Sequence, residues 1–551
     1  MSNGAQALIR TLVDAGVTTC FTNPGTSEMH FVAALDSVPD MRAVLALFEG
    51  VATGAADGYA RMADAPGATL LHLGPGLGNG LANLHNARRA KVPIVNIVGD
   101  HATYHAQYDA PLQSDIETVA RNVSTWVRTS KSTAELTRDA VDAIVAAKGP
   151  PGQVATLILP ADVSWGEGAE SAAPPALAAP PAASQEVLEA VARTLRDGGR
   201  TAILLGGKAL RERGLIAAGR IAAATGTKLF VEVFPTRLER GAGLPVMERL
   251  AYAPEFASIQ LDGLRHLILV DAKRPASFFA YPGKRSNLVP DGCEVHELAA
   301  PTVDVLGSLE ALVEALGAAD ARPHLQQPSR PTRPAGPLTA EKVCAALGAI
   351  LPEGAIVSDE AVTSGMTLPA NTGGVPRHDW LTLTGGAIGQ GLPVAVGAAV
   401  ACPDRPVFAL EADGSALYTI QSLWTMAREE LDITVVIFNN RSYGILNVEL
   451  ARVGAHGAGR KAKSQLDLSE PALDFVQIGT GFGVSSRRVE TAEQLTDALA
   501  RAIPEPGPHL IEAVIPNVFT ARQLRAMPYA LRALEALPRP IAAVVGRRLN
   551  R

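Results

Sequence analysis

The segments "RPVFALEADGS" (residues 405–415) and "ITVVIFNN" (433–440) decide the fold prediction. Each is a short apolar run that ends in polar residues, and a stretch with helical periodicity lies between them. Buried strands that alternate with helices are typical of a parallel sheet covered on both faces. Because parallel strands end at the same edge of a sheet, Asp413 and Asn440 are expected to lie close together there.

The residues at these two strand ends have the chemistry of a magnesium site. Mg²⁺ prefers six oxygen ligands and seldom takes all of them from protein. Asp413 offers a carboxylate, Asn440 an amide oxygen and Ser442 a backbone carbonyl; a water and two diphosphate oxygens would complete the set. Gly414 and Ser415, at the start of the next helix, offer N–H groups to the diphosphate. An ordinary helix start followed by a loop of asparagines is the alternative.

The same alternation of strands and helices continues along the whole chain. Residues 416–430 are predicted to form one helix, and residues 68–76 a strand that runs into a glycine turn. Two Ala/Pro-rich stretches, 166–185 and 321–338, have no periodicity and are interpreted as linkers. They divide the 551 residues into 1–165, 186–320 and 339–525. The predicted fold is therefore α/β, with three consecutive doubly wound parallel-sheet domains.

Composition excludes several classes of function. The net charge is −6 without a basic block, which disfavours a nucleic-acid or anionic-membrane partner. The four cysteines lie far apart, which disfavours a disulfide framework or a thiolate zinc site and indicates a cytoplasmic protein. The start of the chain has no signal-peptide pattern. The tail 531–551 is mildly basic and apolar, and we expect it to pack or act as a lid rather than anchor in a membrane.

A second motif, "LALFEGVATGAADGYAR" (45–61), places Glu49 between an apolar strand and a helix of small residues. A carboxyl there is expected to be partly desolvated and suited to exchanging a proton with a ring nitrogen. The alternative is a glutamate that only complements the helix dipole.

These motifs occur in order with "NPGTSE" (23–28), "GPGLGNG" (74–80) and "GQGLPVAVGAA" (389–399). The ordered set resembles the thiamine-diphosphate-dependent enzymes of the 2-oxo acid decarboxylase and acetolactate synthase family, over nearly the whole chain. The resemblance implies a pyrimidine-binding N-terminal domain, a middle domain and a diphosphate-binding C-terminal domain. It also implies thiamine diphosphate and Mg²⁺ as cofactors, and a homodimer or homotetramer with each cofactor held between two subunits.

The family pattern also implies individual roles. Glu49 would hydrogen-bond the aminopyrimidine ring, Ile388 would force the cofactor to bend, and Glu360 and Thr363 would line its diphosphate end. The metal ligands would be Asp413, Asn440 and Ser442. The cofactor-binding residues implied in this way are Glu49, Glu360, Thr363, Gly386, Ile388, Asp413, Gly414, Ser415, Asn440, Ser442, Tyr443 and Gly444.

Within the family the N-terminal part is most similar to benzoylformate decarboxylase. Thr26 stands where that enzyme has a catalytic serine, and His72 where it has a catalytic histidine, so Glu49, His72 and Thr26 are the implied catalytic residues. A strand-end histidine bonded to neighbouring backbone is the alternative for His72.

The second catalytic histidine of that enzyme is replaced here by residues 278–280. His101 or His105 could take its place, although both also fit exposed loop positions. The implied substrate-facing residues, which suggest a mainly apolar pocket, are Thr26, His72, His101, Leu112 and Phe279.

The acetolactate synthase branch carries FAD against its middle domain, but Asp271 stands here where a small residue would be expected near the flavin. The predicted function is therefore non-oxidative decarboxylation of a 2-oxo acid to an aldehyde, without a flavin. The alternative is an acetolactate-synthase-type carboligase that condenses a 2-oxo acid-derived enamine with a second carbonyl compound. The presence of Glu49, Asp413 and Asn440 argues against a third possibility, a catalytically silent cofactor-binding protein.

Overall fold

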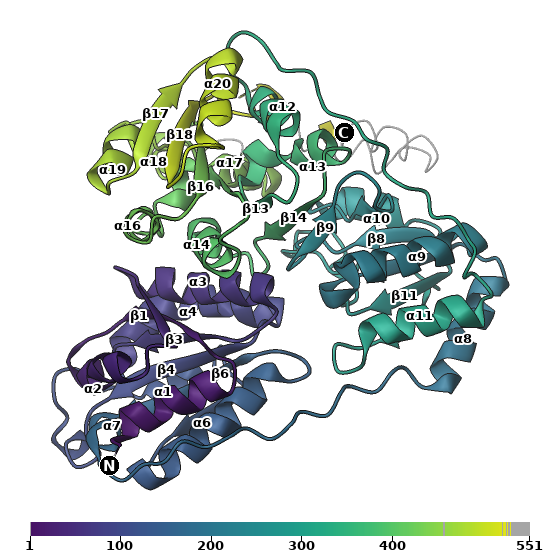
Figure 1. The fold of residues 1–551 in the computed structure, drawn as a ribbon. Helices are drawn as coiled ribbons and strands as arrows, with labels where there is room; N and C mark the ends of the chain where they lie inside the picture. The colour runs from purple at the N-terminus through teal and green to yellow at the C-terminus, as the bar shows by residue number, and fades with distance from the viewer. Residues whose placement is uncertain (1, 456–457, 521, 525, 527–528, 531–551) are drawn as a thin grey trace.

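The computed structural model describes residues 2–455, 458–520, 522–524, 526 and 529–530, and contains three sheets that follow one another along the chain (Figure 1). The predicted α/β architecture of three parallel-sheet units is confirmed. The two predicted linkers run as extended connections along the outside of the molecule (Figure 1). The tail 531–551, expected to pack or act as a lid, lies outside the described residues.

The first sheet has six parallel strands in the order β2-β1-β3-β4-β6-β5. The chain steps from β1 to β2 on one side and returns to β3 on the other, so the strand order reverses between β1 and β3. The strands are β1 (Thr19–Asn23), β2 (Arg42–Leu45), β3 (Gly67–Leu71), β4 (Ile94–Asp100), β5 (Trp126–Thr129) and β6 (Val154–Pro160). The helices are α1 (Gly4–Asp14), α2 (Met29–Ala34), α3 (Glu49–Ala63), α4 (Leu73–Ala90), α5 (Ile116–Ala120), α6 (Thr133–Lys148) and α7 (Ala161–Trp165).

The middle sheet has five parallel strands in the order β10-β8-β7-β11-β12, which reverses between β7 and β11. Its strands are β7 (Thr201–Leu205), β8 (Lys228–Val231), β10 (Glu248–Arg249), β11 (His266–Val270) and β12 (Glu294–Ala299). Its helices are α8 (Gln185–Arg196), α9 (Glu212–Thr225), α10 (Pro254–Leu261) and α11 (Val305–Ala315).

The third sheet has the order β17-β18-β16-β15-β13-β14-β9 and reverses between β13 and β15. Its edge strand β9 comes from the middle segment and pairs antiparallel with β14, which the all-parallel prediction did not anticipate. The strands are β9 (Leu238–Arg240), β13 (Ile356–Glu360), β14 (His378–Thr382), β15 (Val407–Ala412), β16 (Ile433–Asn439), β17 (Ser485–Val489) and β18 (His509–Val514). The helices are α12 (Ala340–Ile350), α13 (Leu368–Thr372), α14 (Gly391–Ala401), α15 (Asp413–Ala416), α16 (Ser422–Arg428), α17 (Gly444–Arg452), α18 (Arg460–Ser464), α19 (Phe475–Gly481) and α20 (Ala492–Ala502).

Two local predictions were wrong. The helix predicted over residues 416–430 is interrupted between α15 and α16. The glycine turn predicted after β3 belongs to α4, which already begins at Leu73. Its glycines allow close helix packing instead: a Cβ on Gly80 would lie 2.8 Å from the Thr53 methyl carbon of α3. The glycine spacing therefore reflects contact between two helices rather than a turn.

Helices α3 and α14 join the first sheet to the third (Figure 1). Their backbones touch, because a Cβ on Gly58 would lie 2.1 Å from the Val394 carbonyl oxygen and a Cβ on Gly397 would lie 1.9 Å from the Ala55 carbonyl oxygen. One buried apolar cluster continues from α3 and α4 into α14 and β15. These two parts of the chain therefore share a core.

A buried arginine connects all three parts of the chain. The Arg61 side chain is fully buried and binds both carboxylate oxygens of Asp57 at 2.7 Å. It also donates to the carbonyl oxygens of Thr236 at 3.1 Å and Thr382 at 2.9 Å, which belong to the middle and third segments. Its charge is thus both paired and hydrogen-bonded, as burial requires.

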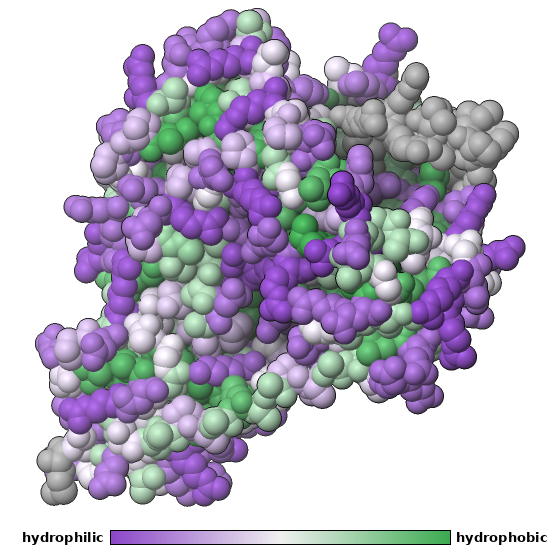
Figure 2. Space-filling view, turned by 45° about the vertical axis from the view of Figure 1, so that its right-hand side comes forward, coloured by the Kyte–Doolittle hydropathy of each residue, from purple (hydrophilic) through white to green (hydrophobic). Residues whose placement is uncertain are grey.

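Hydrophilic and hydrophobic residues are interspersed over the face shown in Figure 2. In the part of the chain that the structure describes, no helix combines the length and the apolar character needed to cross a bilayer.

Candidate active site

Asp413 is buried at the carboxyl edge of the third sheet, at the point where the strand order reverses. It follows β15, and it is 1% exposed. Its Oδ1 accepts from the Gly414 N–H at 2.9 Å and its Oδ2 from the Arg441 N–H at 2.5 Å. Burial raises the pKa of Asp413 to about 6, and these backbone donors oppose the rise. No side-chain cation among the described residues forms an ion pair with it, so a bound cation would supply the missing charge.

The other two predicted metal ligands lie in the loop after β16. The Asn440 Oδ1 accepts from the Ser442 N–H at 2.9 Å, and the Ser442 carbonyl accepts from the Gly444 N–H at 2.8 Å. The Arg441 N–H bond to Asp413 brings this loop to the end of β15. Because a carbonyl oxygen has two lone pairs, each of these oxygens keeps one for a metal ion. The oxygen donors and the unpaired carboxylate fit Mg²⁺.

Two glycines bring this loop close to its neighbours. A Cβ on Gly414 would lie 2.4 Å from a ring carbon of Tyr443, and one on Gly444 would lie 2.8 Å from the Thr363 Oγ1. Ser415 is buried beside them. The structure thus brings these predicted diphosphate-binding residues together, and a side chain added at either glycine would clash with its neighbour.

Glu360 holds the loop that precedes α14. It ends β13, and its two oxygens accept from the Gly389 N–H at 2.7 Å and the Gly391 N–H at 2.6 Å. Burial raises the pKa of Glu360 to about 7. Gly386, with φ +78°, and the half-buried Ile388 belong to the same loop. Glu360 therefore fixes the segment that carries the predicted wedge residue.

Glu411 is the register partner of Glu360 on the adjacent strand and is fully buried. Neither of its carboxyl oxygens has a hydrogen-bond partner among the described residues. Burial raises the pKa of Glu411 well above its usual value, and the neighbouring Glu360 raises it further. The neutral acid is therefore the favoured form of this side chain.

Glu49 is the centre of a second group of polar contacts, in the first part of the chain. It begins α3, is 8% exposed and accepts from the Asn79 Nδ2 at 2.9 Å. A Cβ on Gly76 would lie 2.9 Å from its Oε1, so the backbone of α4 closely approaches the carboxylate. Asn83 of α4 donates to the carbonyl oxygens of Gly50 at 2.8 Å and Gly389 at 3.1 Å. No described hydrogen bond or ion pair joins the Glu49 carboxylate to Asp413.

His72 lies where the strand order of the first sheet reverses. It follows β3, and its Nδ1 is 2.8 Å from the Oε2 of Glu28, which also accepts from the Gly25 N–H at 2.7 Å. Glu28 is 1% exposed, and burial raises its pKa while the Gly25 N–H and His72 lower it. Thr26, two residues before Glu28, is exposed at the start of a short 3₁₀ helix.

Sequence reasoning missed Glu28. The available signal was its position in "NPGTSE", where a glutamate follows a glycine by three residues and can bond back to its N–H. Its contact with His72 joins residues 44 positions apart in the chain.

The remaining substrate candidates lie on loops. His101 is half-buried, its Nε2 has no partner among the described residues, and its ring lies 5.3 Å from that of His105. Leu112 and Phe279 are exposed. In the described part of the chain, no hydrogen bond or ring contact connects either of them, or His101, to His72.

Phe278 packs against Phe234 and Tyr252 and reaches Gly386, where an added Cβ would lie 2.5 Å from its ring. The middle segment therefore contacts the loop that carries Ile388.

The middle sheet has its own strand reversal, and Asp271 lies beside it and lines a cavity together with Lys91 and Glu232. The Asp271 Oδ2 accepts from the Lys208 N–H at 2.9 Å, and its Oδ1 is 2.7 Å from the Lys91 Nζ. Glu232 accepts from the Gly207 N–H at 3.3 Å. Burial raises the pKa of Glu232 to about 7. Two carboxylates thus accept from backbone N–H groups of the turn after β7, which an anionic ligand would otherwise use.

Comparisons with known proteins agree with this arrangement. The model of the thiamine pyrophosphate enzyme N-terminal TPP binding domain matches residues 2–121, and that of the C-terminal TPP binding domain matches residues 366–513. A Mycobacterium tuberculosis protein provisionally named acetolactate synthase large subunit IlvX is 59% identical, over 94% of this chain and 99% of its own length. The benzoylformate decarboxylase of Pseudomonas aeruginosa is 30% identical, over 90% and 96%.

Among solved structures, a thiamine diphosphate-dependent 4-hydroxybenzoylformate decarboxylase of Rhodococcus jostii superposes with a TM-score of 0.81. Its sequence is 25% identical, and the match covers 94% of this chain and 99% of that one.

Proposed function

The chain belongs to the thiamine pyrophosphate enzyme family, and we propose that it is a thiamine diphosphate- and Mg²⁺-dependent decarboxylase that converts a 2-oxo acid to an aldehyde without oxidation. The observation that carries the choice of reaction is the Glu28–His72 pair at the strand reversal of the first sheet. Aldehyde release requires a proton donor at the carbon that loses CO₂, and an oriented histidine suits that task.

The polar groups at the edges of the two sheets have proposed roles that follow from their positions. Asp413, Asn440 and the Ser442 carbonyl would hold Mg²⁺, while the Gly414 and Ser415 backbone would receive the diphosphate. The buried Glu49 carboxylate would exchange a proton with the pyrimidine ring of the cofactor. Thiamine diphosphate supplies the electron sink for the electrons left behind when CO₂ departs.

Proton delivery is proposed to fall to His72. Glu28 engages the Nδ1 of its ring, which leaves the Nε2 to face the substrate. The bond between the carboxylate and the carbonyl carbon breaks, CO₂ leaves, and a proton from the His72 Nε2 ends on the former carbonyl carbon. The exposed Thr26, Leu112 and Phe279 would contact the side chain of the substrate, together with the half-buried His101.

A homodimer or homotetramer is proposed as the active form. Glu49 and Asp413 of one chain share no described hydrogen bond or ion pair, and each lies at the edge of a different sheet. A site formed from Glu49 of one subunit and Asp413 of another would unite the two groups. Closed symmetric dimers are the commonest way to do so.

The second candidate function is acetolactate synthesis, which is favoured by the name of the 59% identical relative. In that reaction the fragment left by decarboxylation joins a second carbonyl compound instead of taking up a proton. The resemblance to acetolactate synthases would bring a flavin to the middle segment. The Asp271 and Glu232 carboxylates accept from backbone N–H groups of the glycine turn there, which supports an enzyme without flavin and hence the first candidate.

One experiment separates the two functions. Purified protein with added thiamine diphosphate and Mg²⁺ is incubated with pyruvate, benzoylformate and 4-hydroxybenzoylformate, and the products are identified by chromatography. We expect CO₂ and the matching aldehyde from at least one of these acids, and no flavin absorbance in the protein. Acetohydroxy acids as the main product, from a yellow protein, would replace the first candidate with the second.

A further inference from the structure

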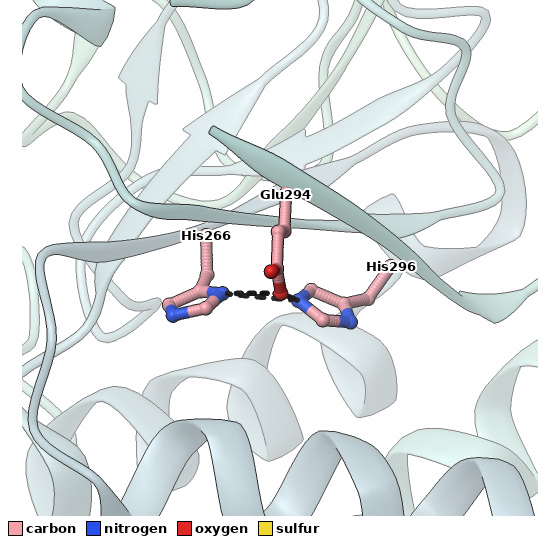
Figure 3. A group of neighbouring side chains, drawn as sticks. All are labelled: His266, Glu294 and His296. Carbon is pink, nitrogen blue, oxygen red and sulfur yellow. Dashed lines mark hydrogen bonds and ion pairs between the residues drawn. The ribbon is translucent and has the colours of Figure 1, made fainter. Parts of the chain in front are cut away.

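Two histidines and a glutamate gather on the middle sheet (Figure 3). His266 begins β11, and Glu294 and His296 are the first and third residues of β12. The strand register pairs His266 with Glu294 and Ile268 with His296. Because side chains two positions apart on a strand share a face, all three side chains lie on one face of two adjacent strands.

The ligand atoms of this cluster have the spacing of a metal site. The His266 Nδ1 lies 3.1 Å from the His296 Nε2, and the Glu294 Oε2 lies 3.6 Å and 3.9 Å from these two nitrogens. A Zn²⁺ ion with ligands at about 2.0–2.1 Å in a tetrahedron holds them roughly 3.3 Å apart. The Glu294 side chain is 72% exposed and can move the few tenths of an ångström required. Figure 3 shows its carboxylate between the two rings.

The chemistry of the cluster selects the ion. Two imidazole nitrogens and one carboxylate oxygen suit Zn²⁺ and its transition-metal neighbours, whereas Mg²⁺ prefers oxygen ligands alone. Burial lowers the pKa of His296, and the nearby His266 lowers it further, which favours the neutral ring that a metal ion needs. Both rings are about three-quarters buried, with 25% and 23% of their side-chain surface exposed.

We propose that His266, Glu294 and His296 form a Zn²⁺ site whose fourth position is open to water. One of the two histidines donates the present hydrogen bond between them. When the ion binds, that ring moves its proton to its other nitrogen. The His266 Nδ1 and the His296 Nε2 then each direct a lone pair at the ion. The ion would tie β12, the edge strand of the middle sheet, to β11. The site lies at the amino ends of these strands, whereas Asp271 follows the carboxyl end of β11. Among the described residues, no hydrogen bond or ion pair joins the cluster to Glu49 or Asp413, so the site would stabilise the middle sheet and be separate from the proposed cofactor site.

The test is a calorimetric titration with Zn²⁺ of full-length, untagged protein already saturated with thiamine diphosphate and Mg²⁺, so that the Asp413 site is occupied. We expect one Zn²⁺ per chain and a higher melting temperature at excess Zn²⁺. His266→Ala and His296→Ala should each weaken binding roughly 100-fold, and Glu294→Gln about 10-fold. His324→Ala, which removes an exposed histidine outside the cluster, is the matched control and should bind Zn²⁺ as the wild type does.

Equal Zn²⁺ affinity in the wild type and in the doubly substituted protein (His266→Ala with His296→Ala) would overturn the proposal, as would failure of the folded wild type to bind Zn²⁺. Co²⁺ provides a second measurement, because a four-coordinate site gives intense visible absorption bands. These bands should appear in the wild type and be absent in the His296→Ala variant. If a histidine variant does not fold, Glu294→Gln decides the question, since its exposed side chain tolerates substitution.

Discussion

At the scale of single residues, the carboxylates of this protein differ mainly in what neutralises them. Glu360 is bonded to two backbone N–H groups and Glu28 to one N–H and a histidine. Asp413 likewise has backbone donors only, and burial raises its pKa. It differs from Glu360 in lying beside the Asn440 and Ser442 oxygens, and this carboxylate without a cation of its own is the proposed metal ligand.

Asp413→Ala should abolish the Mg²⁺-dependent retention of thiamine diphosphate. Loss of the only charged ligand should raise the apparent cofactor Kd at least about 100-fold, because charge supplies most of the affinity of a protein for Mg²⁺. Cofactor titration followed by protein fluorescence, with and without Mg²⁺, measures the effect. Asp404→Ala, an exposed aspartate just before the same strand, should leave the Kd unchanged. An unaltered Kd in Asp413→Ala would show that the metal assignment is wrong.

Glu28→Gln should lower kcat about 10- to 100-fold and change the pH profile of kcat, with little effect on cofactor affinity. Glutamine preserves the shape of Glu28 but removes the charge that orients and stabilises the protonated His72 ring. Steady-state kinetics between pH 5 and 9 tests this expectation. Glu135→Gln, at an exposed glutamate of the same part of the chain, is the control. A variant with the wild-type kcat at every pH would remove the role of Glu28.

Glu232→Gln should make the stability of the protein less dependent on pH. The pKa of Glu232 is raised from 4.5 to about 7, so the folded protein holds this proton more tightly than the unfolded chain. The resulting stabilisation is complete below pH 4.5 and is lost as the pH rises through 7. For a half-buried side chain the loss is on the order of 2 kcal/mol. Urea unfolding at pH 5 and pH 8 should show a smaller difference in the variant than in the wild type; equal differences would contradict the expectation.

At the scale of elements, the sequence predicted where the strands end. It did not predict the start of α4 or the break between α15 and α16. Apolar runs bounded by turns predicted the strands that carry Asp413, Asn440 and His72, since a buried parallel strand leaves a continuous signal. The three-residue β9 is too short to leave one, and it forms only because the middle segment passes the edge of the third sheet. The glycines of residues 74–80 suggested a turn, because close helix contact and turns favour the same residue.

The predicted cofactor residues Asp413, Asn440, Thr363 and Tyr443 came together because each follows closely on β13, β15 or β16, and these adjacent parallel strands end at one edge of the sheet. The partner of His72 could not be predicted with equal ease. Its position depends on how two loops pack in three dimensions, and the sequence pattern of a single segment does not contain that information.

Contact between α3 and α14 depends on glycine, so Gly58→Ala should destabilise the protein by about 1–3 kcal/mol. The added methyl would press on the backbone of Val394, which cannot yield as a flexible side chain does. Gly481→Ala, on α19 with no atom within 4 Å of the added methyl, is the control and should be neutral or slightly stabilising. Denaturant unfolding measures both, and equal stability of Gly58→Ala and the wild type would disprove this account of the helix contact.

At the scale of the whole molecule, the proposed site between subunits makes a prediction that a site within one chain does not. Glu49→Gln and Asp413→Ala should each be nearly inactive. Co-expressed, the two variants should form mixed dimers in which one of the two sites is intact, restoring about a quarter of the wild-type activity if pairing is random. Each variant co-expressed with itself is the control. Activity that stays at the level of the single variants would place Glu49 and Asp413 of one chain in the same site.

The long-range contacts of Arg61 affect how the protein folds during its synthesis. Its ion-pair partner Asp57 precedes it, but its two carbonyl partners are synthesised later, and the Thr382 carbonyl lies 321 residues further along the chain. The N-terminal segment therefore leaves the ribosome with a charged side chain and a surface of small apolar residues that nothing yet covers. Chaperones would shield this surface on the nascent chain until the C-terminal segment emerges. Gene recombination at the linkers would likewise succeed only when both exchanged parts carry matching α3 and α14 surfaces.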